Sequence, residues 1–214
     1  MNWSWLRCTP GLDTRAAFVA RTPRNGTLLD LGSSDGETLN HLAELRPDLK
    51  LFSADKSGQP DRYPAGCEFR AADFETEPLP WAEASMDALT CMHVVEHLRE
   101  LTPLLRETAR VLKPGGRAYF ETPHPRSLTL PSAKGRFTLN FFDDPTHVRV
   151  IELHELRALA QSFSLVAGAN GISRNWIFAA MHPVFVLLPE SRKKFTARIH
   201  WLGWSAYQIF HQPA

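Results

Sequence analysis

Short apolar runs alternate along the chain with segments in which apolar residues recur every three or four positions. The runs predict strands at residues 27–31, 49–54, 68–72, 86–92, 117–121, 164–169 and 205–210. The periodic segments predict helices at residues 12–20, 36–45, 100–112 and 152–163. This alternation is typical of a mostly parallel sheet with helices on both faces, so we predict an α/β fold.

Two segments are too long to be simple connections between these elements. Residues 123–150 and 172–203 each separate neighbouring predicted elements by about thirty positions. Long insertions in compact domains are commonly lids or binding loops. We therefore predict one domain, 1–214, with a loop or lid at 123–150 and a second insertion at 172–203.

Composition excludes several classes of protein. The 214 residues include 24 Lys+Arg and 23 Asp+Glu, and a net charge of +1 gives no overall field that would attract nucleic acid. Cys8, Cys67 and Cys91 form no CxxC pair, which argues against a disulfide framework and a cysteine zinc site. The start lacks a secretory pattern, and His182 and Pro183 interrupt the most apolar stretch, so we expect a cytoplasmic protein.

The near-neutral charge is an average of two unlike regions. Residues 172–204 carry a net charge of +4 and the remainder carries −3. This basic, aromatic-rich segment predicts a peripheral contact with the inner membrane surface through 176–202. The alternatives are that this segment contacts a hydrophobic substrate, that it forms a homodimer interface, or that it simply packs over the sheet. The charged residues of the segment are Arg174, Glu190, Arg192, Lys193, Lys194 and Arg198.

A glycine-containing turn follows the first predicted strand and opens a helix. Gly32 and Gly36 would let a ligand approach bare backbone at the carboxyl end of the strand, where open α/β sheets bind ligands. The spacing is G-x-x-x-G with Asp30 and Asp35 beside it, whereas a dinucleotide site favours G-x-G-x-x-G. These carboxylates suit a cationic ligand, such as the ammonium and sulfonium groups of S-adenosylmethionine.

Two further strands end on acids. Asp55 lies 19 positions after Gly36, close to the separation expected of a carboxylate that binds ribose hydroxyls. Asp73 could accept a hydrogen bond from an adenine amino group, and Phe74 could flank the ring. Each acid alone could be a turn or cap residue. The ordered set of three favours an adenosine-containing cofactor.

With these motifs the sequence resembles the class I S-adenosylmethionine-dependent methyltransferases, in particular the type 11 small-molecule group. The resemblance spans about residues 25–165 and also rests on residues 86–98 and 111–121. It implies a seven-stranded Rossmann-like sheet with an antiparallel last strand and S-adenosyl-L-methionine as cofactor. Ser34 stands where many relatives carry a third glycine. The implied cofactor-binding residues are Asp30, Gly32, Ser34, Gly36, Asp55, Lys56, Ala72, Asp73, Phe74, Met92 and His93.

Residues 93–97 have the H-x-x-E-H spacing of an inverted zinc-protease motif. His93 ends a predicted strand, however, so the helical face that such a site requires is not expected. Some quinone-precursor methyltransferases in the resembled family use a pair like Glu96 and His97 near a divalent metal; helix capping and packing are the alternative. We predict no metal centre.

The loop 141–149 combines acid, imidazole and guanidinium groups within the first insertion. We predict His147 as a general base oriented by Asp144, with His97 as a further catalytic residue. Arg149 and Asp143 would bind substrate, and a capped, solvated loop is the alternative. His124 is a reserve candidate.

These features predict methylation of a small acceptor, most simply at an oxygen of a saccharide or lipid-linked intermediate. In the resembled family, enzymes that act on sugars often end with a segment like residues 201–209. Alternatives are N- or C-methylation of a quinone-like metabolite and a non-catalytic, cofactor-binding partner subunit. We expect a small-molecule or lipid-linked partner and no nucleic acid.

Overall fold

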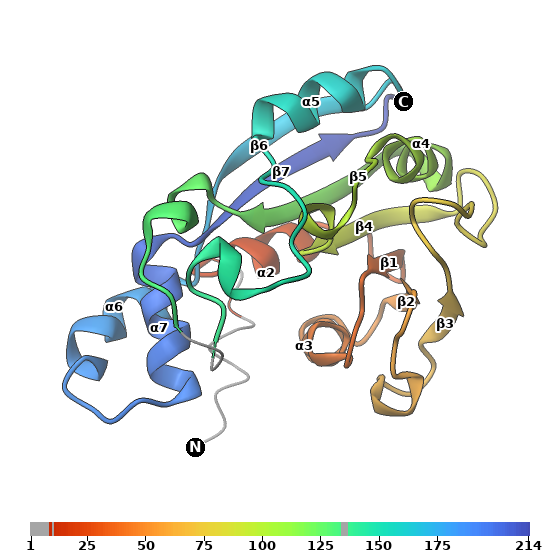
Figure 1. Cartoon of the computed structure of the whole chain (residues 1–214). Helices are drawn as coiled ribbons and strands as arrows, with labels where there is room; N and C mark the ends of the chain where they lie inside the picture. The colour runs from red at the N-terminus through yellow and green to blue at the C-terminus, as the bar shows by residue number, and fades with distance from the viewer. Residues whose placement is uncertain (1–8, 10, 134–136) are drawn as a thin grey trace.

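One mixed sheet organises the computed structural model, which describes residues 9, 11–133 and 137–214 (Figure 1). Within these residues, seven strands lie in the order β3-β2-β1-β4-β5-β7-β6. Cys8 and most of the N-terminal segment used to predict sorting lie outside the described residues. The strands are β1 (Thr27–Leu31), β2 (Lys50–Asp55), β3 (Glu68–Ala71), β4 (Met86–Met92), β5 (Leu112–Pro123), β6 (Val166–Ser173) and β7 (Ser205–His211).

Strand directions confirm the predicted fold. Strand β1 pairs in parallel with β2 and β4, while β7 runs antiparallel between β5 and β6. The register places Pro123, the last residue of β5, opposite Ser205, the first residue of β7. The end of β5 and the start of β7 therefore meet at the carboxyl edge of the parallel strands.

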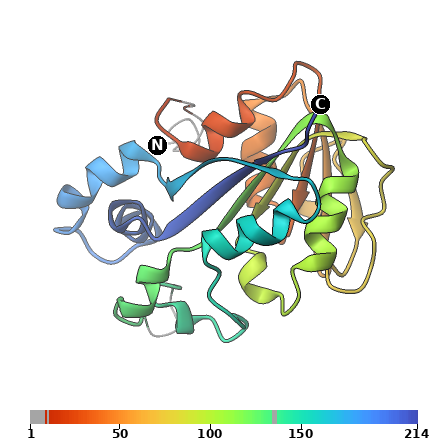
Figure 2. The same cartoon turned by 90° about the horizontal axis from the view of Figure 1, so that it is seen from above.

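Helices lie on both faces of the sheet (Figure 2), and alternating side chains of the central strands pack against them. Leu28 packs with Phe18 of α2 (Thr14–Val19) and Leu42 of α3 (Glu37–Leu45). Leu29, on the opposite face, belongs to the cluster that contains Leu104 of α4 (Thr102–Val111), and α5 (Leu153–Gln161) covers the same face. This period of two follows from the pleat of the strand. It puts Asp30 on the face covered by α2 and α3.

The two long insertions take different forms. The first contains two short 3-10 helices, η3 (Pro125–Thr129) and η4 (Phe141–Asp143). The second forms a helical hairpin, α6 (Trp176–Phe185) and α7 (Arg192–Leu202), at one end of the sheet (Figures 1 and 2). Two other 3-10 helices are η1 (Pro60–Arg62) and η2 (Val95–His97). In the described part of the chain, every helix is too short or too polar to cross a bilayer.

Predicted and observed boundaries differ most at the later strands. Strand β5 extends beyond the predicted 117–121 because its continuation pairs with β4 and β7, although Pro114, Gly115 and Gly116 interrupt the apolar pattern. Strand β6 runs to Ser173 rather than ending at 169, and β7 supplies its pairing. Tertiary pairing thus overrides weak local strand signals.

Candidate active site

The turn between β1 and α3 adopts left-handed backbone at Gly32, Ser34 and Gly36, with φ of 79°, 44° and 81°. A Cβ at Gly32 would lie 2.2 Å from Val94 Cγ2, and one at Gly36 would lie 2.5 Å from Tyr63 Cδ1. Both positions therefore need glycine for conformation and for space. Ser34 adopts the left-handed region despite its side chain, so the loop does not require a third glycine there.

Asp55 ties this turn to the end of β2. Its Oδ2 accepts from the Ser34 N–H at 2.8 Å, and its Oδ1 accepts from the Ser57 N–H at 2.7 Å. Each carboxylate oxygen keeps a second lone pair for a ligand hydroxyl. Asp55 therefore both shapes the glycine turn and lies where a ribose-binding acid is predicted.

The third acid, Asp73, follows β3 and forms an ion pair with Lys56, with Nζ and Oδ2 2.7 Å apart. The hydrogen bond from Lys56 lowers the pKa of Asp73. The neighbouring Ala72 and Phe74 are buried in the hydrophobic core. Phe74 thus packs in the core next to the end of β3. The predicted contact of Phe74 with an adenine ring remains a prediction.

Asp30 is buried in β1 and accepts a hydrogen bond of 2.6 Å from Thr90 Oγ1 of β4. Burial raises its pKa to about 7, and the charge of Asp55 adds to the shift. A cation bound nearby would favour the ionised form. The raised pKa shows that, without a ligand, nearby positive charge is too weak to offset the burial of Asp30.

The carboxyl end of β4 is formed by Met92 and His93, and His93 has a left-handed φ of 57°. Its Nδ1 donates to Glu96 Oε1 at 3.0 Å and its Nε2 lies 3.2 Å from both Glu121 Oε1 and Ser205 Oγ. Burial opposes the charged imidazole, but the hydrogen bonds to Glu121 and Glu96 outweigh it and raise the pKa of His93 to about 9. Both ring nitrogens are therefore held as donors.

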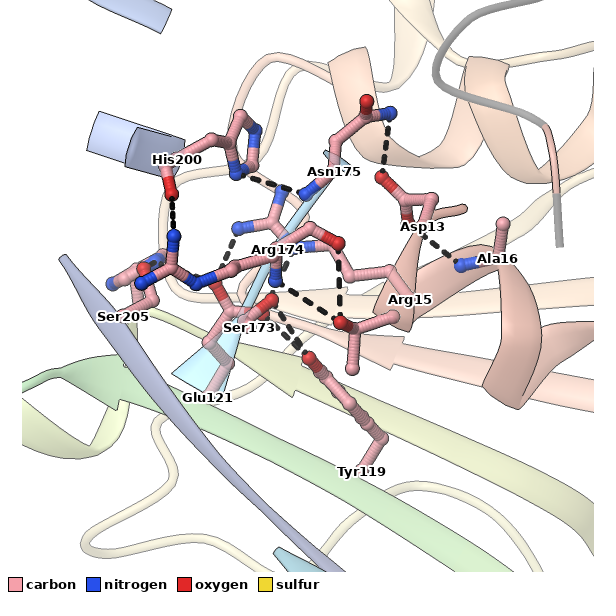
Figure 3. A network of polar contacts seen from close by, with 12 residues as sticks. Asp13, Arg15, Ala16, Tyr119, Glu121, Ser173, Arg174, Asn175, His200 and Ser205 are labelled. Atoms are coloured by element: carbon pink, nitrogen blue, oxygen red, sulfur yellow. Dashed lines mark hydrogen bonds and ion pairs between the residues drawn. The ribbon is translucent and has the colours of Figure 1, made fainter. Parts of the chain in front are cut away.

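A buried polar network underlies this histidine (Figure 3). Glu121 of β5 is fully buried and forms a two-pronged ion pair with Arg15 of α2, with Nε and Oε2 2.9 Å apart. Tyr119 donates its hydroxyl to Glu121 Oε2 at 2.8 Å and also contacts Ser173 Oγ. Burial alone would raise the pKa of Glu121, but Arg15 holds it well below the ordinary value. The network joins α2, β5 and β6.

Helix α2 is fixed to the second insertion by further contacts (Figure 3). Asp13 caps α2 through the Ala16 N–H and accepts from Asn175 Nδ2 at 3.0 Å. Asn175 N in turn donates to His200 Nδ1 of α7 at 3.1 Å. Helix α2 and helix α7 are thus held together across a shared space.

That space is a cavity of about 500 Å³. Thr38 of α3 lies on one side of it, and Met92 and His93 at the end of β4 lie on another. Arg15 and Ser205 add hydrogen-bonding groups. Apolar lining comes from Phe137, Phe195, Ile199 and Trp204.

Known proteins share this architecture. A family model described as a methyltransferase domain matches residues 4–166. An S-adenosylmethionine-dependent methyltransferase from Mesorhizobium loti has a TM-score of 0.64 at 16% identity, covering 95% of this chain and 100% of that one. A chain of the Haloferax volcanii complex with the Trm112 methyltransferase activator has a TM-score of 0.68 at 18% identity, covering 99% of this chain and 96% of that one.

The match to the family model covers most of the chain. The protein belongs to the class I S-adenosylmethionine-dependent methyltransferases. Among curated relatives, the ubiquinone biosynthesis O-methyltransferase of Albidiferax ferrireducens is 26% identical over 153 residues, or 64% of this chain and 59% of that protein. Across three such relatives the aligned part makes up only 23–59% of their lengths.

The residues of this methyltransferase fit its family's cofactor. The turn that exposes backbone at Gly32 and Gly36, the lone pairs that Asp55 retains and the buried Asp30 together suit a nucleoside that carries positive charge. Met92 and His93, also predicted to contact the cofactor, lie at the adjoining strand end. The individual contacts of these residues with a bound cofactor remain predictions.

The predicted catalytic group of the methyltransferase lies elsewhere. His147 Nε2 is 4.0 Å from Asp144 Oδ2, so the two residues do meet. Among the described residues, however, the cavity lining includes His93 but neither His147 nor His97. The side chain of His147 is only 4% exposed and packs against Phe141. The geometry does not support His147 as a base toward a ligand in this cavity.

The predicted substrate-binding residues are engaged in loop structure. Asp143 accepts from Ser132 Oγ and from the N–H groups of Ala133, Leu139 and Asn140; burial opposes its charge, but these hydrogen bonds lower its pKa to about 2. Arg149 pairs with Glu155, 3.4 Å away. His124 Nδ1 accepts from the Arg126 N–H and caps η3. All three side chains thus have partners within the protein, and their contacts with substrate remain predictions.

Sequence reasoning missed the network of Arg15 and Glu121. A signal existed for each: Arg15 lies in the predicted covering helix, and Glu121 ends a motif of the resembled family. Their partnership joins residues 106 positions apart. Only the sheet order, which brings α2 over β5, reveals it.

Proposed function

We propose that this methyltransferase transfers the methyl group of S-adenosylmethionine to a hydroxyl oxygen of a small amphipathic acceptor, a saccharide or lipid-linked intermediate. One observation carries the proposal. The cavity of about 500 Å³ borders both Thr38, beside the glycine turn, and Met92 and His93 at the end of β4. An acceptor in this space would therefore adjoin the expected cofactor site.

The lining of the cavity supports an acceptor with a polar and an apolar part. His93 and Ser205 lie together at one wall, where they could orient a hydroxyl group. Phe137 and Phe195 stack with ring centroids 4.4 Å apart and supply an apolar wall. Pockets with an apolar lining and a few converging polar groups are typical of small-molecule sites.

The bound cofactor would supply a methyl group on a positively charged sulfur. In the transfer, the acceptor oxygen forms a bond to the methyl carbon as the sulfur–carbon bond breaks, and the hydroxyl proton leaves to water. The chain would contribute alignment and exclusion of bulk solvent, the main requirements of an in-line transfer. His93 and Ser205 would hold the acceptor oxygen in line.

The second insertion supports delivery of the acceptor from a membrane surface. At the end of α6 and in the turn that follows it, exposed fractions are 65% for Val184, 85% for Leu187 and 51% for Leu188. Helix α7 continues from this turn to the cavity, which it lines with Phe195 and Ile199. A lipid-linked acceptor could thus pass from an anionic bilayer to the cavity along one helix.

Methylation of a quinone-like metabolite is the second candidate. The names of two relatives favour it: a ubiquinone biosynthesis O-methyltransferase and a demethylmenaquinone methyltransferase. The aromatic walls of the cavity would also accept such a ring.

An acceptor screen tests the proposal. The full chain is incubated with methyl-labelled S-adenosylmethionine and panels of saccharides, lipid-linked saccharides and quinone precursors, and products are identified by mass spectrometry. We expect O-methylated product from one panel and a loss of at least tenfold in turnover for His93→Gln, with exposed His154→Gln as control. Cofactor binding without turnover on any panel would instead support a non-catalytic partner subunit.

Membrane delivery is tested by co-sedimentation with phosphatidylglycerol-containing vesicles. Leu187→Glu with Leu188→Glu should reduce the bound fraction several-fold, because both side chains would have to bury charge in the interface. Val166→Glu, at an exposed residue of β6, is the control. If the wild type ignores vesicles but sediments as a dimer that Leu187→Glu disrupts, the exposed turn contacts a second copy.

A further inference from the structure

A second group of histidines lies beyond the cavity lining, directly after β4. Glu96 and His97 belong to η2, and His147 comes from the loop 141–149. One ligand atom from each of the three residues lies within 4.8 Å of the others. The two imidazole ring centroids are 4.8 Å apart. Residues 50 positions apart therefore present three metal-binding side chains to one point.

The tautomer of His147 follows from its hydrogen bond. Its Nδ1 lies 2.7 Å from the carbonyl oxygen of Phe141. A carbonyl oxygen can only accept, so Nδ1 carries the proton. The lone pair of the neutral ring is then on Nε2, which takes no part in the contact with Phe141.

His97 is held in the same tautomer through two further residues. Thr146 Oγ1 donates its only proton to Asp144 Oδ1, 2.5 Å away, because a carboxylate accepts. The same hydroxyl oxygen lies 2.9 Å from His97 Nδ1, so it accepts the Nδ1 proton of that ring. The lone pair of His97 is again on Nε2. Histidines that bind metal through one nitrogen usually donate the other N–H in this way.

Glu96 completes the group. Its side chain is fully buried, and Oε1 accepts from His93. Its Oε2 is buried without a hydrogen-bond partner among the described residues. An unpaired buried carboxylate oxygen is costly, and it is explained when an unseen ligand satisfies it.

We propose that Glu96, His97 and His147 form a binding site for a divalent transition metal, with zinc as the ion that two imidazoles and one carboxylate suit best. Tetrahedral zinc at its usual bond lengths would hold ligand atoms about 3.3 Å apart, so the three side chains would have to move closer together on binding. The fourth position would take water or Asp144, whose Oδ2 is 4.0 Å from His147 Nε2. This inference replaces the expectation of no metal centre.

The site differs from the inverted zinc-protease motif suggested by the residues 93–97. That motif would pair His93 with His97, whereas His93 is turned to Glu121 and the cavity lining. The second histidine comes from the first insertion instead. The metal would fasten the loop 141–149 to η2, where the Val148 N–H already donates to the Glu96 carbonyl at 2.9 Å.

Metal binding to the whole chain tests the inference without any acceptor. After removal of metals with a chelator and dialysis, zinc is titrated into the protein by calorimetry, and cobalt binding is followed by visible absorption. We expect one zinc per chain with micromolar or tighter affinity, and intensified cobalt bands typical of four-coordination. His147→Gln and His97→Gln should each weaken zinc binding at least tenfold, and His154→Gln should not.

Circular dichroism establishes that each variant is folded before its affinity is compared. The inference is overturned if the folded wild type binds zinc no better than His97→Gln with His147→Gln. If those variants do not fold, the wild-type cobalt spectrum decides: a spectrum identical to that of the hydrated ion overturns the site. Neither result depends on the identity of the acceptor or on turnover.

Discussion

The two halves of the sheet's carboxyl edge are built in different ways. At the ends of β2 and β3, acids contact groups in their own or a neighbouring turn, as Asp55 contacts Ser34 and Ser57, and these acids are partly exposed. At the ends of β4, β5 and β6, Glu121 binds side chains from distant segments and is fully buried. In the first half, polar atoms remain available to a ligand. In the second half, most polar atoms form hydrogen bonds and ion pairs within the protein.

This difference predicts how each half responds to substitution. A solvated turn can lose one contact and exchange it for water, so changes there should alter ligand binding more than stability. A buried ion pair that loses one partner leaves a charge without compensation. Substitutions around Glu121 should therefore lower the stability of the fold as well as alter the cavity.

The largest effect is expected from Glu121→Gln. It leaves Arg15 and His93 without their shared carboxylate, and the free energy of unfolding should fall by about 3 kcal/mol. Urea denaturation measures the change. Glu155→Gln, which removes an exposed pair with Arg149, should cost less than about 0.5 kcal/mol. Equal losses in the two variants would show that burial of the ion pair does not set its contribution to stability.

Asp30→Asn should produce a pH-dependent effect of intermediate size. The pKa of Asp30 is raised from 3.8 to about 7 in the fold, so wild-type stability falls as pH rises through this window, when only the unfolded state releases the proton. Relative to wild type, the variant should gain up to about 1.4 kcal/mol per pH unit between these values. Thr90, Asp55 and Arg15 are the groups that act on Asp30.

Denaturation of the wild type and the variant at several pH values, without cofactor, measures this difference. Saturating S-adenosylmethionine should reduce it, because a nearby cation favours ionised Asp30. A difference independent of pH would contradict a protonated Asp30 in the free protein.

The smallest effect on stability, but a clear one on binding, is expected at Asp55. Asp55→Asn replaces one of two acceptor oxygens with a donor, so the dissociation constant for S-adenosylmethionine should rise about tenfold, which is about 1.4 kcal/mol. Calorimetry measures it, and exposed Asp61→Asn is the control. Tighter binding of a nicotinamide dinucleotide than of S-adenosylmethionine would overturn the cofactor assignment itself.

The same contrast explains what could be predicted from the sequence. The turn at Gly32 and Gly36 and the acid Asp55 lie in segments whose strand and helix patterns are strong, so their positions were predictable. The relation between Arg15 and Glu121 depends on which helix covers which strand. No local pattern contains that information.

The histidines show the same limit. The H-x-x-E-H spacing is that of a histidine pair, which is not expected from the sequence because His93 ends a predicted strand. In the structure a left-handed His93 and a 3-10 turn direct the two rings to different partners. His147 was recognised as chemically notable, although its neighbours proved to be Glu96 and His97. The sequence thus identified which side chains are chemically notable, but not the partners toward which they point.

The place of β7 in the sheet also has a consequence for how the molecule is made. Strand β6 pairs with β7, and β5 pairs with β7 on its other side, yet β7 is the last of these strands to leave the ribosome. Until it emerges, β5 presents an open edge, and Trp204 and Ser205 cannot yet close the cavity. A nascent chain would hold a folded glycine turn beside an incomplete cavity, and the open edge of β5 would be the surface that most needs protection by chaperones.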